Sequence, residues 1–146
     1  MHDRDWIEAH IPHQGTMCLL DRVESWDLEQ IHCLANSHRS PDNPLRSHGR
    51  LNSACGIEYA AQAMAVHGAL RASNRPSGAG YLVSVRGTRL YVPRLDDIEA
   101  DLTVIAHCIT CEGSNILYRF EIGAKGRVLL EGRAAVVLDA LSARGI

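Results

Sequence analysis

Residues 51–72 read LNSACGIEYAAQAMAVHGALRA, and this stretch decides the fold. It has no proline and is rich in alanine and straight-chain side chains, which favour a helix. Asn52 or Ser53 would make a good N-cap. Apolar residues occur almost all the way round the helix, and helices of that kind are buried rather than lying on a surface. The sequence therefore predicts one long buried helix over 51–72.

The rest of the chain is expected to form strands and loops around this helix. Before the helix come a short N-terminal turn or helix near residues 6–10 and a loop over 37–49 that contains proline, asparagine and glycine. The expected strands span residues 17–26, 29–35, 81–92, 99–111, 115–122 and 128–138. A breaker cluster at 74–78 and tight glycine-containing turns separate them, which favours an antiparallel sheet. The predicted class is α+β, with a sheet that covers one long central helix.

Composition indicates one globular unit. The 146 residues are 46% hydrophobic and 22% charged, so we expect a single domain over 1–146. The net charge of −2 gives no reason to expect nucleic acid or an anionic membrane as a partner. No apolar run approaches the roughly 18–20 residues of a membrane span, and the acidic N-terminus does not resemble a signal peptide. We therefore predict a cytoplasmic protein.

Five cysteines occur in apolar surroundings, as small core residues do. Cys108 and Cys111 form a C-x-x-C inside the strand expected over 99–111. Residues three apart in a strand point to opposite faces, so one metal ion could not easily bind both thiols. The sequence therefore predicts no metal site.

Glu58 is the most informative side chain of the central helix. It lies four residues before Gln62, hence on the same helical face, and its neighbours are almost all apolar. Burial disfavours the charged form of a carboxylate, so Glu58 is a candidate general acid. The alternative is a Glu58 on a narrow exposed stripe, hydrogen-bonded to Gln62.

Two histidines occupy the loop before the helix. His38 follows the strand expected to end near residue 35, and His48 lies near the helix entrance. Histidine is the usual general base near neutral pH, although a single loop histidine is more often only solvated. His32, His67 and His107 are interpreted as structural.

Three segments, taken in order, resemble one enzyme family. Residues 11–23 read IPHQGTMCLLDRV, Glu58 and Gln62 form a helical Glu-x-x-x-Gln, and residues 81–97 resemble a later strand that ends in a proline and an acidic turn. Together they resemble the 3-hydroxyacyl-[acyl-carrier-protein] dehydratases, in particular the subgroup associated with aryl-polyene or polyketide-type lipid clusters. The resemblance implies a hot-dog fold, in which an antiparallel sheet wraps around one long central helix.

The resemblance also implies a catalytic pair. His38 would remove the proton α to a thioester carbonyl, and Glu58 would protonate the departing 3-hydroxyl, giving a trans-2-enoyl thioester and water. A backbone N–H near the start of the helix would polarise the carbonyl. No metal or organic cofactor is needed. Family active sites combine a histidine and an acid from different subunits, so the chain would form a homodimer or a heterodimer with a related hot-dog subunit.

The chain departs from the family pattern around the histidine. The family usually shows His-Phe-Pro-Gly there, whereas His38 is followed by Arg39-Ser40-Pro41. A Met-Pro-Gly motif before the helix is missing, and Gly49-Arg50-Leu51 occupies roughly that region. His48 therefore stays open as the alternative base.

Substrate recognition is assigned to Arg46, Arg50 and Gln62. An acyl carrier protein is acidic and its phosphopantetheine thioester carries a phosphate, which arginine can bind through two hydrogen bonds. Solvated loop arginines are the alternative.

Two other functions are compatible with the sequence. A hot-dog acyl thioesterase would use Glu58 to activate water or attack the thioester. A non-catalytic partner subunit would complete the active site of a heterodimeric dehydratase. Fold alone does not separate the dehydratase from the thioesterase, because one scaffold carries many functions.

Overall fold

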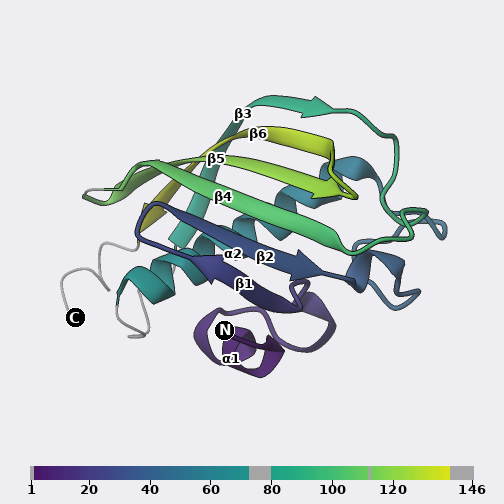
Figure 1. Cartoon of the computed structure of the whole chain (residues 1–146), viewed down its shortest axis with the longest axis horizontal. Coiled ribbons are helices and arrows are strands. Elements are labelled where there is room, and N and C mark those ends of the chain that lie inside the picture. Colours follow the sequence, from purple (N-terminus) through teal and green to yellow (C-terminus); the bar gives the residue numbers. More distant parts are fainter. Residues whose placement is uncertain (1, 73–79, 112, 139–146) are drawn as a thin grey trace.

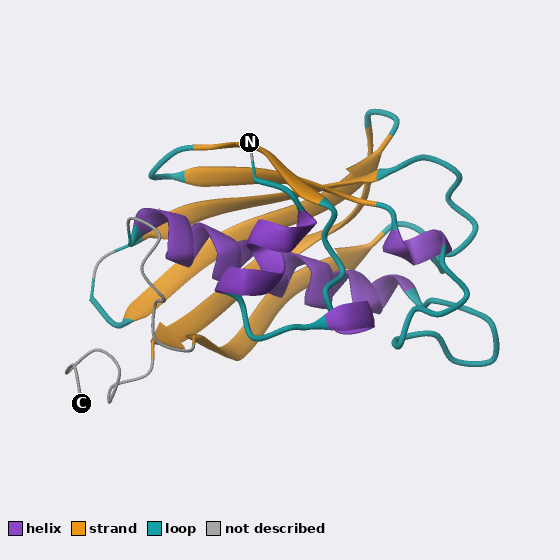
Figure 2. Cartoon of the chain, turned by 90° about the horizontal axis from the view of Figure 1, so that it is seen from below, coloured by secondary structure: helices purple, strands orange, loops and turns teal. Residues whose placement is uncertain are grey.

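A computed structural model describes residues 2–72, 80–111 and 113–138, and it contains a six-stranded antiparallel sheet wrapped around one helix (Figures 1 and 2). The helices and strands are α1 (Arg4–His10), β1 (Arg22–Trp26), β2 (Gln30–Ala35), α2 (Gly56–Arg71), β3 (Gly80–Leu90), β4 (Leu102–Thr110), β5 (Asn115–Ala124) and β6 (Arg127–Leu138). The strand order is β1-β2-β4-β5-β6-β3. The α+β class and the sheet-around-helix architecture expected from the sequence are confirmed.

The central helix begins five residues later than the expected position 51. Asn52 caps a 3₁₀ turn at Ser53–Cys55, its side chain accepting a hydrogen bond from the Ala54 amide at 2.8 Å. Helix α2 then begins at Gly56. A Cβ at this glycine would lie 2.8 Å from a methyl carbon of Leu130, so the glycine lets the start of α2 approach the sheet.

Only one side of α2 is fully buried. That side packs against the inner face of the sheet and includes Tyr59, Met64 and Leu70. Along the other side of α2 Glu58 is exposed and Ala61, Ala65 and Gly68 are half-buried, and Ala54 in the preceding 3₁₀ turn is exposed as well. We call these five residues the open stripe. The expectation of a helix buried all round is therefore wrong for the single chain, because small side chains satisfy an apolar pattern whether or not a neighbour covers them.

The strand expected over 17–26 is shorter than predicted. Residues Gly15–Met17 form a 3₁₀ turn, and the ladder with β2 begins only at Arg22. The reason lies in α2. Gln62 accepts a hydrogen bond from the Leu19 amide at 2.9 Å and donates one to the Met17 carbonyl at 2.7 Å. This backbone is thus bonded to a helix side chain rather than to a neighbouring strand.

Strand β3 forms one edge of the sheet and, among the described strands, pairs with β6 alone. The β3–β6 register shifts twice, between Leu82 and Ser84 and between Arg86 and Arg89. Gly87 lies within the second shift with φ +62°, a conformation that glycine adopts without steric cost.

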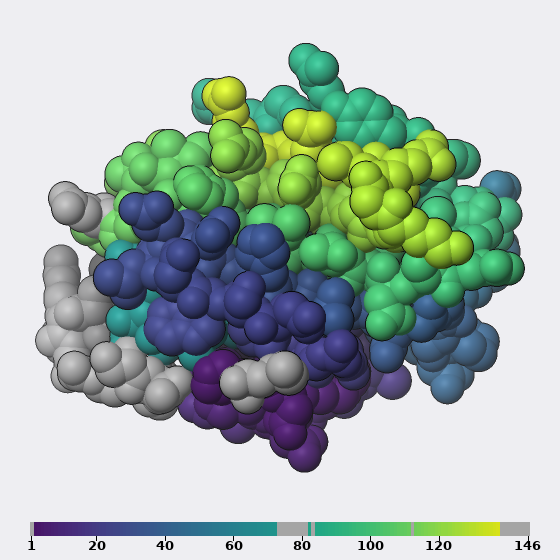
Figure 3. All heavy atoms as spheres, viewed as in Figure 1, coloured from purple at the N-terminus to yellow at the C-terminus, as the bar shows by residue number. Residues whose placement is uncertain are grey.

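The outer face of the sheet, turned towards the viewer in Figure 3, is uncovered by α2. A groove of about 540 Å³ lies on this face. Most of its lining residues are polar, among them His32, His107, Arg119 and Glu131, and Ile105 and Phe120 are apolar.

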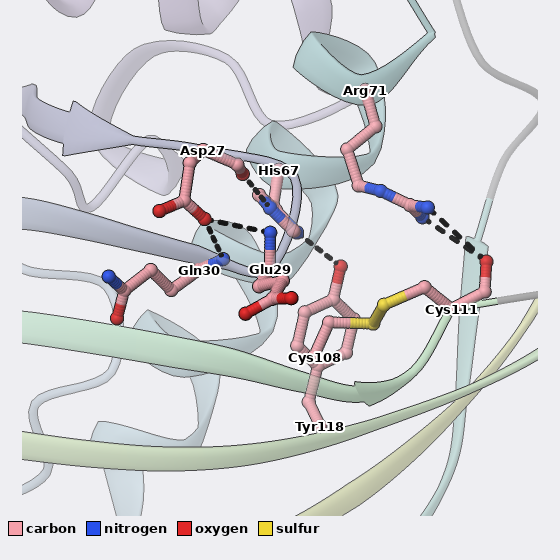
Figure 4. The surroundings of a disulfide bond; sticks show 8 residues. All are labelled: Asp27, Glu29, Gln30, His67, Arg71, Cys108, Cys111 and Tyr118. Atoms are coloured by element: carbon pink, nitrogen blue, oxygen red, sulfur yellow. Dashed lines mark hydrogen bonds between the residues drawn. A yellow bond between two sulfur atoms is a disulfide. The ribbon is translucent and has the colours of Figure 1, made fainter.

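Cys108 and Cys111 form a disulfide bond (Figure 4). The sequence analysis placed them on opposite faces of one strand, which is wrong because β4 ends at Thr110. The β4–β5 register also shifts between Cys108 and Thr110, so Cys111 leaves the strand and its sulfur reaches that of Cys108. Cys18 and Cys33 are buried, as expected of core cysteines. No helix in the described ranges is long and apolar enough to span a membrane.

Candidate active site

His38 lies in a 3₁₀ turn, Ser37–Arg39, that directly follows β2, and its side chain is fully buried. Its Nε2 atom lies 3.0 Å from the carbonyl oxygens of both Ile98 and Ala100. A carbonyl only accepts hydrogen bonds, so Nε2 must carry the proton. Nδ1 then holds the free lone pair, and it is buried without a hydrogen-bond partner among the described residues.

The surroundings of His38 keep its imidazole neutral. Burial lowers the pKa of His38 below its ordinary value, because a charged ring would lose its hydration. The Ile98 and Ala100 carbonyls partly oppose this effect, while the positive charge of Arg39 adds to the lowering. At neutral pH the ring is therefore uncharged, with its proton on Nε2 and Nδ1 as the available basic nitrogen.

A buried network of hydroxyl and amide groups fixes the His38 turn onto α2. Ser37 donates to the Leu19 carbonyl at 2.7 Å, and its oxygen lies 2.8 Å from the Tyr59 hydroxyl. Asn43 donates to the same hydroxyl at 3.0 Å and to the Ser37 carbonyl at 2.9 Å. Because Ser37 gives its only hydroxyl proton to Leu19, the Tyr59 hydroxyl is the donor to Ser37. Burial also raises the pKa of Tyr59.

Sequence reasoning missed Ser37, Asn43 and Tyr59. The available signal was the hydroxyl of Tyr59 inside an apolar helix, since a buried tyrosine hydroxyl usually has a partner.

The two candidate histidines differ in their surroundings. His48 is exposed at the tip of the turn 47–50, where Ser47 and Arg50 exchange two backbone hydrogen bonds of 2.8 and 3.0 Å. His48 and Gly49 both have positive φ, of 53° and 73°, as a type I′ turn requires. Among the described residues, the His38 ring has hydrogen-bond partners that fix its orientation and the His48 ring has none.

The arginines assigned to substrate recognition have different roles in the chain. Arg46 donates to the His38 carbonyl at 3.1 Å and to the Gly49 carbonyl at 3.2 Å, so it braces the loop. Arg50 is exposed in the 47–50 turn and available to a ligand.

Glu58 lies on the open stripe and is exposed to solvent. The burial that the sequence analysis expected for this carboxylate is therefore absent from the single chain. Gln62 is buried, and its amide bonds to the backbone of Met17 and Leu19. Across the described residues, Glu58 forms no hydrogen bond with either Gln62 or His38.

The entrance to α2 is held by the segment between β3 and β4. The Leu51 amide donates to an Asp96 carboxylate oxygen at 2.8 Å, and the Leu95 amide donates to the Leu51 carbonyl at 2.8 Å. Asp96 also forms an ion pair with Arg94. The Arg94 guanidinium, through its hydrogen bonds, holds the pKa of the Asp96 carboxyl well below its usual range.

Solved structures of the same architecture include dehydratases and thioesterases. A dehydratase heterocomplex, ApeI:P from Xenorhabdus doucetiae, contains a chain with 23% identity and a TM-score of 0.81, and the match covers 95% of each chain. Zebra fish thioesterase superfamily member 2 has 13% identity and a TM-score of 0.65, over 93% of this chain and 95% of that chain. A mutant thioesterase, PA1618 from Pseudomonas aeruginosa, has 15% identity and a TM-score of 0.62, over 94% and 95%. At these identities the likeness establishes the hot-dog fold.

Curated proteins gave no match to this sequence. Residues 6–143 do match a family model, described as ApeP-like: ApeP dehydratase. Because this match spans nearly the whole chain, the protein belongs to the ApeP-like dehydratase family.

Proposed function

We propose that this chain is the histidine-bearing subunit of a dehydratase that removes water from a 3-hydroxyacyl thioester on an acyl carrier protein. The observation that carries the proposal is the fixed ring of His38. Its Nε2–H is bonded to two carbonyls, which leaves Nδ1 as the atom able to accept a proton.

In the proposed reaction, Nδ1 of His38 takes the proton α to the thioester carbonyl. The Cα–H electrons form the new double bond, the C–O bond at carbon 3 breaks, and a protonated Glu58 carboxyl supplies the proton that lets the hydroxyl leave as water. His38 ends protonated and Glu58 ionised, and a proton transfer through solvent restores both. Because Nδ1 is buried in the single chain, the incoming thioester must displace the groups that cover it.

We further propose that a second hot-dog subunit completes the site. The small side chains of the open stripe allow close approach of another backbone, and the edge strand β3 has unpaired backbone groups that can extend a sheet. A partner over the stripe would bury Glu58, which is exposed in the single chain, and would close the site around the thioester. The ApeI:P chain with 23% identity occurs in a heterocomplex, which favours a heterodimer over a homodimer as the first partner to test.

The acyl carrier protein would deliver its phosphopantetheine thioester near the exposed Arg50. Arg50 is available to bind the phosphate, whereas Arg46 would act by holding the His38 loop.

The test incubates the chain, alone and co-produced with a related hot-dog subunit, with a 3-hydroxyacyl carrier-protein thioester. Intact mass follows the products. We expect loss of one water, reduced at least about 100-fold in His38→Ala and in Glu58→Gln, since general acid–base groups contribute about 10²–10⁴-fold. His48→Gln is the matched control and should keep the wild-type rate. An unchanged rate in His38→Ala within the complex would reject the assignment of His38.

A thioesterase is the second candidate, because an exposed Glu58 is accessible to water and two of the structures of like fold are thioesterases. The same experiment separates the two functions. Release of free acid, dependent on Glu58 but not on His38, would identify hydrolysis. Water loss that needs the complex and survives both substitutions in this chain would identify a non-catalytic partner subunit.

A further inference from the structure

We propose that Asp96 is a positioning residue that couples the entrance of α2 to the tautomer of His38. The segment 93–100, between β3 and β4, contacts both parts of the candidate site. The structural half of this inference is independent of the reaction, whereas its kinetic half rests on the proposed function.

The first contact is at the helix entrance. The Asp96 side chain is only 5% exposed, and its carboxylate accepts the Leu51 amide at 2.8 Å while paired with Arg94. Backbone hydrogen bonds between Leu95 and Leu51, and from the Ser53 amide to the Pro93 carbonyl, tie the two segments together. The Asp96 carboxylate therefore holds Leu51 and Arg94 in place, because breaking either contact would leave a desolvated charge without a partner.

The second contact is at the histidine. Ile98 and Ala100, two and four residues beyond Asp96, place their carbonyl oxygens 3.0 Å from the same Nε2 of His38. The Ile98 amide also donates to the Leu95 carbonyl at 3.0 Å, which closes a tight turn across Asp96. A displacement of Asp96 is thereby transmitted to the carbonyl at 98.

The carbonyls of Ile98 and Ala100 determine which ring nitrogen of His38 can act as the base. A neutral imidazole places its proton on the nitrogen that faces an acceptor. When the carbonyls move apart, Nε2 loses its acceptors and the Nδ1–H tautomer becomes populated, which removes the free lone pair from Nδ1. Asp96 would thus control the position of the base and, through Leu51, the approach to the first backbone N–H groups of α2.

A purely structural ion pair makes a different prediction. It would lower the stability of Asp96 variants but leave the His38 tautomer of the folded protein unchanged. The ring nitrogen signals of His38 therefore distinguish the two roles.

The experiment measures ring ¹⁵N shifts in histidine-labelled protein between pH 5 and 8, with the His38 signals assigned by their absence from His38→Gln. In the wild type we expect Nε2 protonated and Nδ1 unprotonated. Asp96→Ala should give averaged nitrogen shifts. In the water-loss assay its kcat should fall about 10- to 100-fold with KM changed less than about twofold, because small displacements of a catalytic group reduce the rate by such factors.

Three further variants define the contact. Asp96→Asn keeps an oxygen that accepts from Leu51 and should restore most of the wild-type tautomer and kcat. Arg94→Gln removes the ion pair and should shift the His38 signals in the same direction as Asp96→Ala, by less. Asp97→Asn removes the same charge from the adjacent exposed side chain and should match the wild type.

Wild-type His38 shifts in folded Asp96→Ala, or in folded Arg94→Gln if the alanine variant does not fold, would overturn the inference. A tautomer that follows Asp96 in a protein without dehydratase activity would instead reject the proposed function and leave the positioning role in place.

Discussion

At the scale of the residue, two buried histidines have their tautomers set by backbone carbonyls. His38 faces Ile98 and Ala100, and His67 on α2 lies 2.8 Å from the Asp27 carbonyl through Nε2. Nδ1 of His67 lies 2.8 Å from the Tyr118 hydroxyl, which must then be the donor (Figure 4). Burial lowers the pKa of His67 and raises that of Tyr118 to about 12. His67 differs from His38 in that both of its ring nitrogens are hydrogen-bonded. This fits the structural role expected for His67 from the sequence.

Tyr118→Phe tests this buried pair. The substitution leaves Nδ1 of His67 as a buried acceptor without a donor, so the free energy of unfolding should fall by about 1–3 kcal/mol. Urea denaturation followed by circular dichroism measures it. As a control, Tyr91→Phe removes an exposed hydroxyl that donates to Glu131 at 2.8 Å. This variant should change the free energy of unfolding little. Equal losses in the two variants would contradict the argument.

At the residue scale, local order in the sequence was enough to nominate His38, whose catalytic role stays a prediction. His38 could be singled out because it follows a strand and precedes the helix. Tyr59 and Asp96 could not be assigned roles, because Ser37, Asn43 and Leu51, which bond to them, lie 16 to 45 residues away and become neighbours only in the fold.

At the scale of the element, α2 was recognisable from its composition, but its exposed side was not. Alanine and glycine fit the inside of a protein and a close contact with another chain equally well, so the pattern did not reveal the open stripe. The early start expected for β1 failed for a related reason. A single long-range side chain, Gln62, holds the backbone of 17–19 away from the sheet.

Substituting alanine for each of the two glycines of α2 should change the free energy of unfolding in opposite directions. At Gly56 a Cβ would meet two methyl carbons of Leu130 and one of Ile122 within 2.8 to 3.0 Å, so Gly56→Ala should cost about 1–3 kcal/mol by overpacking. At Gly68 a Cβ would meet no atom of the described residues within 4 Å, and Gly68→Ala should raise the free energy of unfolding by about 0.5–1 kcal/mol through helix propensity. Thermal unfolding of both variants tests the pair. Stabilisation by Gly56→Ala would contradict the close packing of α2 on the sheet.

At the scale of the whole molecule, stability should depend on pH between 7 and 5. The pKa values of His38 and His67 are both lowered by burial in the folded state. As the pH falls through about 6.5, the unfolded chain binds protons at these positions and the folded chain does not. The free energy of unfolding should therefore decrease by up to about 1.4 kcal/mol per pH unit for each histidine.

Urea denaturation at a series of pH values measures this slope. His67→Gln removes one of the two groups and should make the slope shallower, whatever its effect at pH 7.5. A stability that rises on acidification over this range would show that the buried rings are not held neutral.

The two register shifts of β3 have a consequence for assembly in a crowded cell. A straight edge strand can accept almost any extended peptide, and mispairing of that kind leads to aggregation. Here the shifts bend the edge, Gly87 interrupts its spacing, and the exposed Arg86 and Arg89 add charge along it. A regular, straight strand would lose hydrogen bonds at both shifts and would lie beside those arginines. The same bulges therefore disfavour pairing with regular strands of other proteins and would restrict a subunit that extends the sheet to one of complementary shape.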